Sequence, residues 1–176
     1  MKKMHPYRIS ITGPESTGKT TLARDLAEYF HTAWVPEYAR EYLDGLGRTY
    51  GFEDLEKIAR GQRMLEERFA RDAGRFLFCD TDLLVMKVWS EYRFQKCAPF
   101  ILESLRDRPY DGYVLCGTEV PWEYDPLREN PGEREELYRI FRSELNQMNA
   151  RFLEVAGTPE ERVKQVADFL LNLLNP

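Results

Sequence analysis

The sequence predicts an α/β fold in which a five-stranded parallel sheet carries helices on both faces. The first observation is that short apolar runs alternate with longer stretches of helical periodicity along the chain. The second is the stretch Gly13–Thr20, GPESTGKT, which follows an apolar run and precedes a helical pattern. This strand, loop and helix match the phosphate-binding pattern G-x-x-x-x-G-K-[ST]. The predicted fold class is therefore a P-loop NTPase of the nucleoside- and nucleotide-kinase type.

Each fixed position of this loop has a chemical reason. Gly13 and Gly18 lack a Cβ, so the backbone can curl and direct N–H groups at phosphate oxygens. The loop opens a helix, whose N-terminus favours an anion. Lys19 is predicted to contact the β- and γ-phosphates, and the Thr20 hydroxyl to contact Mg²⁺. The expected cofactors are ATP and Mg²⁺, and the expected ATP contacts are Gly13, Glu15, Ser16, Thr17, Gly18, Lys19, Thr20 and Thr21.

Composition limits the classes of function. The 176 residues predict a single domain over 1–176, and 43% hydrophobic with 31% charged residues is ordinary for a globular protein. A net charge of −5 argues against binding to nucleic acid or to a membrane surface. No apolar run is long enough to span a bilayer, and Met1–Pro6 leads into no signal-peptide core. Three widely spaced cysteines are expected to be reduced, so a cytoplasmic location is predicted.

The periodicity predicts the order of the elements. Strands are expected at Tyr7–Thr12, Ala33–Val35, Phe76–Cys79, Tyr113–Cys116 and Phe152–Val155. Helices are expected at about 18–30, 37–43, 52–72, 82–92, 99–105, 133–146 and 159–174. Ligands of such sheets bind beyond the carboxyl ends of the strands. The segments predicted to share this rim are 13–20, 36–40, 80–82, 117–122 and 156–162, and the loop at about 117–134 is the expected lid.

Two carboxylates follow the third predicted strand. Asp80 ends the apolar run and is predicted to bind Mg²⁺ or its waters. Asp82 lies two residues further on, and we expect one carboxylate to organise Mg²⁺ and the other to orient the attacking hydroxyl or accept its proton. The alternative for Asp82 is the N-cap of the following helix. The predicted catalytic residues are Lys19, Asp80, Asp82 and Arg128, with Thr20 and Asp80 at the metal.

Candidate acceptor residues come from two further segments. Glu37, Tyr38 and Arg40 follow the second predicted strand, beside the phosphate site. In the loop after the fourth strand, an aromatic such as Trp122 indicates packing or a ligand stack. Arg128 and Arg134 are candidate lid arginines, although a solvated charge at the start of a helix explains Arg134 equally well. Two aromatics after Asp82, Trp89 and Tyr92, are interpreted as core or groove residues rather than cofactor contacts.

Five motifs together resemble a known family. They are GPESTGKT (13–20), VPEYAREYL (35–43), IARGQ (58–62), FCDTDLL (78–84) and VPWEYDPLRE (120–129). In this order and spacing they resemble the ribosylnicotinamide kinase domain of the bacterial NadR family, which is also described as an AAA-like ATPase or kinase domain. The resemblance covers nearly the whole chain.

The resemblance implies transfer of a phosphoryl group from Mg·ATP to the 5′-hydroxyl of nicotinamide riboside, which gives nicotinamide mononucleotide. It places the loop Val120–Arg128, with Trp122 and Asp125, in the acceptor pocket and lid. Full-length NadR proteins also carry a DNA-binding domain and a nucleotidylyltransferase domain, and we expect neither here, because the phosphate loop begins at Gly13. The expected partner is a small nucleoside.

Two other functions stay open at this point. A kinase for a different nucleoside, or for a nucleoside monophosphate, would use an arginine such as Arg40 to bind the acceptor phosphate. An ATP-binding regulatory module without a small-molecule acceptor is the third possibility. The oligomeric state does not follow from the sequence.

Overall fold

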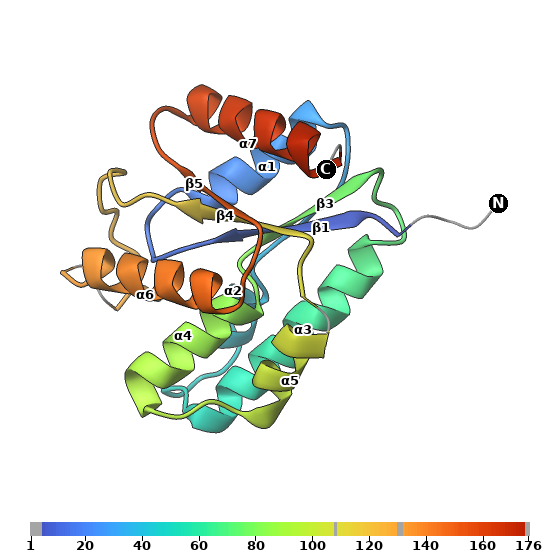
Figure 1. The fold of residues 1–176 in the computed structure, drawn as a ribbon. Helices are drawn as coiled ribbons and strands as arrows, with labels where there is room; N and C mark the ends of the chain where they lie inside the picture. Colours follow the sequence, from blue (N-terminus) through green and yellow to red (C-terminus); the bar gives the residue numbers. More distant parts are fainter. Residues whose placement is uncertain (1–4, 108, 130–131, 175–176) are drawn as a thin grey trace.

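The computed structural model describes residues 5–107, 109–129 and 132–174, so parts of the predicted N-terminal segment and lid loop, residues 1–4, 130 and 131, lie outside the description. Within these ranges a five-stranded parallel sheet has the order β2-β3-β1-β4-β5 (Figure 1). The strands are β1 Tyr7–Thr12, β2 Trp34–Val35, β3 Phe76–Asp80, β4 Gly112–Cys116 and β5 Phe152–Val155. The helices are α1 Lys19–Tyr29, α2 Tyr38–Asp44, α3 Phe52–Phe69, α4 Leu83–Phe94, α5 Pro99–Asp107, α6 Arg134–Gln147 and α7 Pro159–Leu174.

The predicted fold class is confirmed, and the differences lie at the ends of elements. β3 runs one residue further than expected, because Asp80 still pairs with Ile11 of β1. α4 begins at Leu83, since Asp82 caps it from outside. α3 ends at Phe69, three residues early, where the Phe69 carbonyl accepts from the N–H groups of Asp72 and Ala73 in a turn. These are the boundary errors that fraying helix ends produce.

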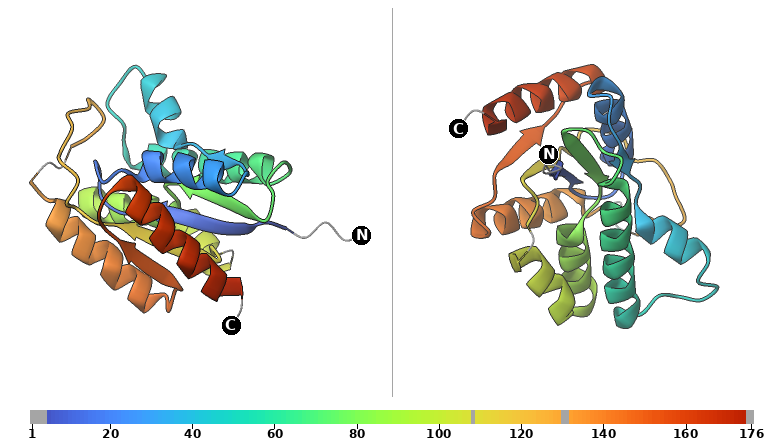
Figure 2. Two further views of the ribbon diagram at one scale, coloured as in Figure 1. Left: turned by 90° about the horizontal axis from the view of Figure 1, so that it is seen from above. Right: turned by 90° about the vertical axis from the view of Figure 1, so that its right-hand side faces the viewer.

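Helices cover both faces of the sheet (Figures 1 and 2). α1 and α7 contact each other on one face, while α3, α4, α5 and α6 lie on the other. The alternation of side chains along β3 supplies both layers: Phe76 and Phe78 pack towards α1 and α7, and Leu77 and Cys79 pack towards the opposite helices. A strand buried on both faces is what a central parallel strand requires. None of the helices in the described ranges combines the length and apolarity needed to cross a membrane.

Strand register brings the rim loops together. In β1, Ile11 lies opposite Asp80 of β3, and Thr12 lies opposite Leu115 of β4. The chain leaves β1 through Gly13, whose φ is +130°. A Cβ at this position would lie 3.1 Å from the Cys116 carbonyl oxygen, so the phosphate loop passes β4 too closely for a side chain.

The start of α2 rests on α3 at a glycine. The Tyr38 ring lies over Gly61, where an added Cβ would stand 1.9 Å from the ring atom Cε1. The Tyr38 backbone N–H donates to Gln62 Oε1 at 3.0 Å. Both partners belong to the IARGQ sequence of α3, which therefore fixes the chain at the residue after Glu37.

Gly61→Ala is expected to destabilise the protein, although alanine favours a helix over glycine by about 1 kcal/mol. Crowding against Tyr38 outweighs this gain, and we expect a net loss of about 1–2 kcal/mol in the free energy of unfolding. Urea denaturation followed by circular dichroism measures it. The control is Gly45→Ala, since a Cβ at Gly45 would come no closer than 3.7 Å to other atoms. A Gly61 variant as stable as the control would contradict the packing described.

Candidate functional site

A cavity of about 260 Å³ opens at the carboxyl ends of the strands. Its floor is the phosphate loop, and all of the predicted ATP contacts from Gly13 to Thr21 line it. Four further predicted site residues also line the cavity, and they come from three different segments: Glu37, Arg40, Asp80 and Arg128. Four others do not: Tyr38, Asp82, Trp122 and Asp125.

The phosphate loop is held in a bent conformation by its own side chains. Ser16 has a φ of 55° and Gly18, the N-cap of α1, a φ of 78°. The Pro14 carbonyl oxygen accepts from Lys19 Nζ at 2.6 Å and from the Thr17 hydroxyl at 2.8 Å. The ammonium group therefore lies across the mouth of the loop, where an anion would meet it.

Thr20 and Asp80 meet at the end of β3. The Thr20 hydroxyl donates to Asp80 Oδ2 at 2.6 Å. The other oxygen, Oδ1, is buried and has no hydrogen-bond partner among the residues described. Burial, with the nearby Glu37 carboxylate, raises the pKa of Asp80 to about 6, against the lowering effect of the Thr20 hydrogen bond. A buried carboxylate oxygen without a donor, beside a hydroxyl, suits Mg²⁺.

The described residues contain no group of three or more His, Cys, Asp or Glu side chains that could hold a metal ion. A P-loop site does not need one, because Mg²⁺ keeps several waters and takes most of its remaining ligands from phosphates. Thr20 and Asp80 therefore fit the ion together with a bound nucleotide, and not as a preformed cage.

Asp82 occupies the N-cap position that the sequence left as its alternative. Its side chain is completely buried beneath the cavity. Its oxygens accept from the Ser10 hydroxyl, from the Val85 N–H at 2.8 Å and from Thr12 Oγ1 at 3.4 Å. Burial raises the pKa of Asp82 to about 6 in spite of these hydrogen bonds. The Asp82 carboxylate therefore caps α4 and does not line the cavity.

The backbone conformation of Thr81 explains why the side chains of Asp80 and Asp82 point in different directions. Residues two apart on a strand point to the same face. Thr81 has a φ of 64°, so the strand alternation stops at Asp80 and the chain turns before α4 begins. Asp80 is left facing the cavity, and Asp82 is directed into the protein.

The side of the cavity formed by the start of α2 carries charges of both signs. Glu37 lines the wall next to Asp80, at the start of α2. Arg40, one turn later, donates to Asp125 Oδ2 at 2.9 Å. The Leu127 N–H and the Arg40 guanidinium hold the pKa of Asp125 below its ordinary value. Asp125 thus positions Arg40, which lines the cavity. The Asp125 side chain itself does not line the cavity.

Tyr38 and Trp122 pack elsewhere than predicted. Tyr38 covers Gly61, as described above, because the helix turns its ring towards α3. Trp122 faces the Arg134 guanidinium, 5.7 Å from the ring centroid. Arg134 in turn donates to the backbone carbonyls of Ser16 and Val120 and does not line the cavity.

The inner wall of the cavity is apolar and was largely missed by the sequence reasoning. It comes from one face of α4, with Val85, Val88, Trp89 and Tyr92, and from Leu137 and Phe141 of α6. Trp89 is further fixed by its indole N–H, which donates to the Tyr50 hydroxyl at 2.8 Å. The spacing of i, i+3, i+4 and i+7 in α4 was the available signal, but this spacing equally describes a helix face in the core.

The lid segment, residues 117–129, rests on the crown of the phosphate loop. Ser16 Oγ accepts from the Glu123 N–H at 2.9 Å and from Arg128 Nη1 at 3.3 Å. Glu15 Oε2 accepts from the Glu129 N–H at 3.0 Å. Arg128 also donates to the Glu123 carbonyl at 2.6 Å, so its charge is held at the edge of the cavity.

The bond between Ser10 and Asp82 can be tested by a double-mutant cycle. Asp82→Ala and Ser10→Ala are expected to be non-additive in the free energy of unfolding, with a coupling of about 0.5–3 kcal/mol, because each removes the other's partner. Urea titrations of the two single variants and the double variant give the coupling. Asp168→Ala, at an exposed position of α7, is the control and is expected to be additive with Ser10→Ala. Additivity in the Ser10–Asp82 cycle would show that the contact contributes nothing.

Comparison with known proteins supports the resemblance to NadR. The trifunctional NAD biosynthesis/regulator protein NadR of Escherichia coli is 28% identical over 153 residues, which are 84% of this chain and 37% of that protein. The NadR protein of Salmonella typhimurium matches at the same identity and coverage. The chain thus spans little more than a third of these relatives.

Solved structures agree on the fold. A crystal structure of NadR protein in complex with NR has a TM-score of 0.81 and 22% identity, over 94% of this chain and 52% of that one. A NadR structure with NAD and AMP-PNP has a TM-score of 0.77 at 20% identity, over 96% and 50% of the two chains. Thymidylate kinase from Ehrlichia chaffeensis has a TM-score of 0.65 at 14% identity, over 98% and 100%. At these identities the likeness shows a P-loop kinase fold.

The family model described as AAA domain matches residues 8–162, which include the phosphate loop, Asp80 and the lid segment. Because this match extends over most of its length, the chain belongs to that AAA domain family.

Proposed function

We propose that this protein is an ATP-dependent kinase that phosphorylates the 5′-hydroxyl of nicotinamide riboside to give nicotinamide mononucleotide. The observation that carries the proposal is a single cavity that joins the phosphate loop to an apolar, partly aromatic wall, with Glu37 and Asp80 between them. The similarity to NadR, and a NadR structure in complex with NR, the usual abbreviation of nicotinamide riboside, support this choice of acceptor.

The donor side of the cavity would bind ATP. Backbone N–H groups of the phosphate loop and Lys19 would contact the phosphates, where they stabilise the charge that develops during transfer. Thr20 and Asp80 would hold Mg²⁺, since the Thr20 hydroxyl lies 2.6 Å from Asp80 Oδ2 and no donor in the described part of the chain reaches Asp80 Oδ1. When bound, the ion would supply positive charge that offsets the charge of the phosphates during transfer. Arg128 lines the cavity beside Ser16 and would supply the positive charge of the lid to a transferred phosphoryl group.

We assign to Glu37 the role of accepting the proton of the acceptor hydroxyl. The sequence left this role open between Asp80 and Asp82, but Asp82 is buried, does not line the cavity, and accepts hydrogen bonds from the Ser10 hydroxyl and the Val85 N–H. Glu37 lines the cavity and stands close enough to Asp80 to raise its pKa. It makes no side-chain bond to the N-terminus of α2, so capping does not occupy it. A carboxylate in this place can orient the 5′-hydroxyl towards the γ-phosphate and accept its proton.

The inner wall suits a flat cation. Nicotinamide riboside carries a pyridinium ring, and a cation over an aromatic face gains about 0.5–2 kcal/mol. Trp89 and Tyr92 line the wall, whereas Trp122 and the 86% exposed Tyr124 do not. The proposed ring site therefore lies on α4 and not in the lid. A kinase for a nucleoside monophosphate is the second candidate, because Arg40 and Arg128 both line the cavity and could bind an acceptor phosphate.

The acceptor is tested by ADP release from Mg·ATP with nicotinamide riboside, common nucleosides and nucleoside monophosphates, and by identification of products by mass. We expect acceptor-dependent release with nicotinamide riboside and a product heavier by one phosphoryl group. Lys19→Ala should abolish it, because the loss of one such charge costs about 10²–10³-fold or more. Release with a nucleoside monophosphate alone would support the second candidate. ATP binding without release for any acceptor would indicate a regulatory module.

Glu37→Gln is expected to lower kcat by about 10²–10⁴-fold, since the amide cannot accept the proton, while the KM for ATP changes little. Steady-state kinetics at saturating acceptor measure both values. Glu41→Gln removes an exposed carboxylate from the same helix and is the matched control, with near wild-type turnover expected. A Glu37 variant with unchanged kcat would exclude this residue as the proton acceptor.

A further inference from the structure

Arg162 is a buried cation behind the phosphate loop. It lies in the first turns of α7, and only 3% of the residue is exposed. Nη1 donates to the Thr17 carbonyl at 2.7 Å, and Nη2 donates to Glu119 Oε1 and, at 3.5 Å, to the Gly117 carbonyl. Glu119 also accepts from the Gly157 N–H at 2.9 Å. One guanidinium thus connects the phosphate loop, the base of the lid segment and the start of α7.

Arg134 makes the same kind of connection from α6. Its Nη1 donates to the Ser16 carbonyl at 3.0 Å and to the Val120 carbonyl at 2.7 Å. The two arginines therefore bind the carbonyls of successive loop residues, Ser16 and Thr17, and each also binds a backbone carbonyl at the base of the lid segment. Neither arginine lines the cavity, so both approach the loop from its outer side.

Because of the geometry of the peptide bond, contacts with these outer carbonyls also set the direction of the N–H groups that face the phosphate site. In a planar trans peptide the C=O of one residue and the N–H of the next point in opposite directions. A guanidinium that holds the Ser16 carbonyl outward holds the Thr17 N–H inward, and one on the Thr17 carbonyl does the same for the Gly18 N–H. These two N–H groups belong to the loop that lines the cavity.

The loop conformation is one that needs such support. Ser16 has a φ of 55°, a left-handed conformation that costs a residue with a side chain about 1 kcal/mol or more. Arg162 Nη1 also lies only 3.3 Å from the position of a Cβ on Gly18, so it lies directly against the N-cap of α1.

We propose that Arg134 and Arg162 are positioning residues, which hold the outer carbonyls of Ser16 and Thr17 so that the phosphate loop is preorganised for a nucleotide. The inference rests on the proposed function only in that it takes the cavity to bind a nucleoside triphosphate. Since each arginine also binds the base of the lid segment, the same contacts fix the lid to the loop.

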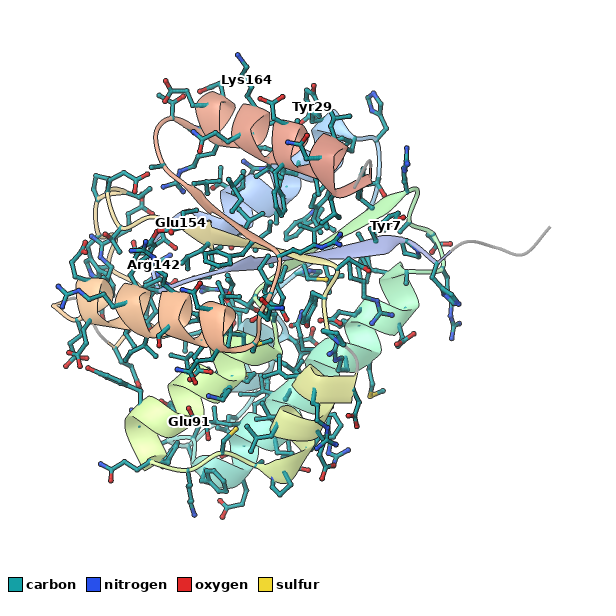
Figure 3. The ribbon with its side chains drawn as sticks, in the orientation of Figure 1. Tyr7, Tyr29, Glu91, Arg142, Glu154 and Lys164 are labelled. Carbon is teal, nitrogen blue, oxygen red and sulfur yellow. The ribbon has the colours of Figure 1, made fainter. Side chains whose placement is uncertain are left out.

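Isothermal titration of AMP-PNP in Mg²⁺ buffer tests the proposal without any acceptor. Arg134→Met and Arg162→Met are each expected to weaken binding by about 10- to 100-fold, the value of a misdirected hydrogen bond to a charged group. Inorganic tripolyphosphate should lose affinity by a similar factor, because the effect lies at the phosphates. The matched controls are Arg139→Met on α6 and Lys164→Met on α7; both positions are exposed, and Lys164 points away from the molecule (Figure 3).

Further variants separate positioning from folding and from charge. Circular dichroism establishes that each sample is folded at the titration temperature. Where Arg162→Met does not fold, Arg162→Met with Glu119→Gln removes the unpaired carboxylate, and Arg134→Met stands as an independent test. Arg162→Lys keeps the charge and one donor, so an affinity between those of wild type and Arg162→Met is expected.

Three results would overturn the inference. The first is a folded methionine variant that binds AMP-PNP within twofold of wild type. The second is a loss confined to AMP-PNP and absent for tripolyphosphate, which would place the effect at the adenine. The third is full recovery by lysine, which would assign it to charge alone. If wild type itself binds no AMP-PNP, the proposed function fails, and the inference fails with it.

Discussion

The parallel pairing of β1 with β3 is the constraint on which the site depends. It sets Ile11 opposite Asp80, so the first turn of the helix after β1 meets the end of β3. The result is the 2.6 Å contact between the Thr20 hydroxyl and Asp80. A slip of one residue would turn every side chain of β3 to the other face and would bury Asp80 among apolar groups. The apolar layers on both faces of the sheet exclude that slip, so core packing determines where the phosphate loop and the carboxylate meet.

The rim contains several features that destabilise the folded chain locally. Asp80 and Asp82 are both desolvated, and Ser16 and Thr81 both adopt a positive φ. Such features persist where neighbouring contacts determine the conformation, and they are concentrated at sites of function. Each of the four has a hydrogen-bond partner: the Thr20 hydroxyl for Asp80, the Ser10 hydroxyl and a backbone N–H for Asp82, the Ile11 carbonyl for the Thr81 N–H, and the Glu123 N–H for the Ser16 hydroxyl.

The sequence predicted the structure correctly at positions where only one physical role explains the residue found there. The glycines of the phosphate loop belong to that class, since Gly13 and Gly18 both have a positive φ, and the alternation of strands and helices predicted the sheet. It left Asp82 open between two roles, because a carboxylate at this position serves as a cap or as a base. In the structure the turn at Thr81 places Asp82 at the N-cap of α4. Sequence reasoning also missed the contacts of Arg162, which join residues 145 and 43 positions apart and leave no local pattern.

The lid segment links the two halves of the cavity. Glu123, Leu127 and Arg128 line it on the acceptor side, while the same segment binds Ser16 and Glu15 of the phosphate loop. A ligand that displaces these loop contacts therefore also changes the wall offered to the acceptor. Coupling between two binding free energies is reciprocal. If binding of an acceptor alters nucleotide affinity through these contacts, binding of the nucleotide must alter acceptor affinity by the same factor.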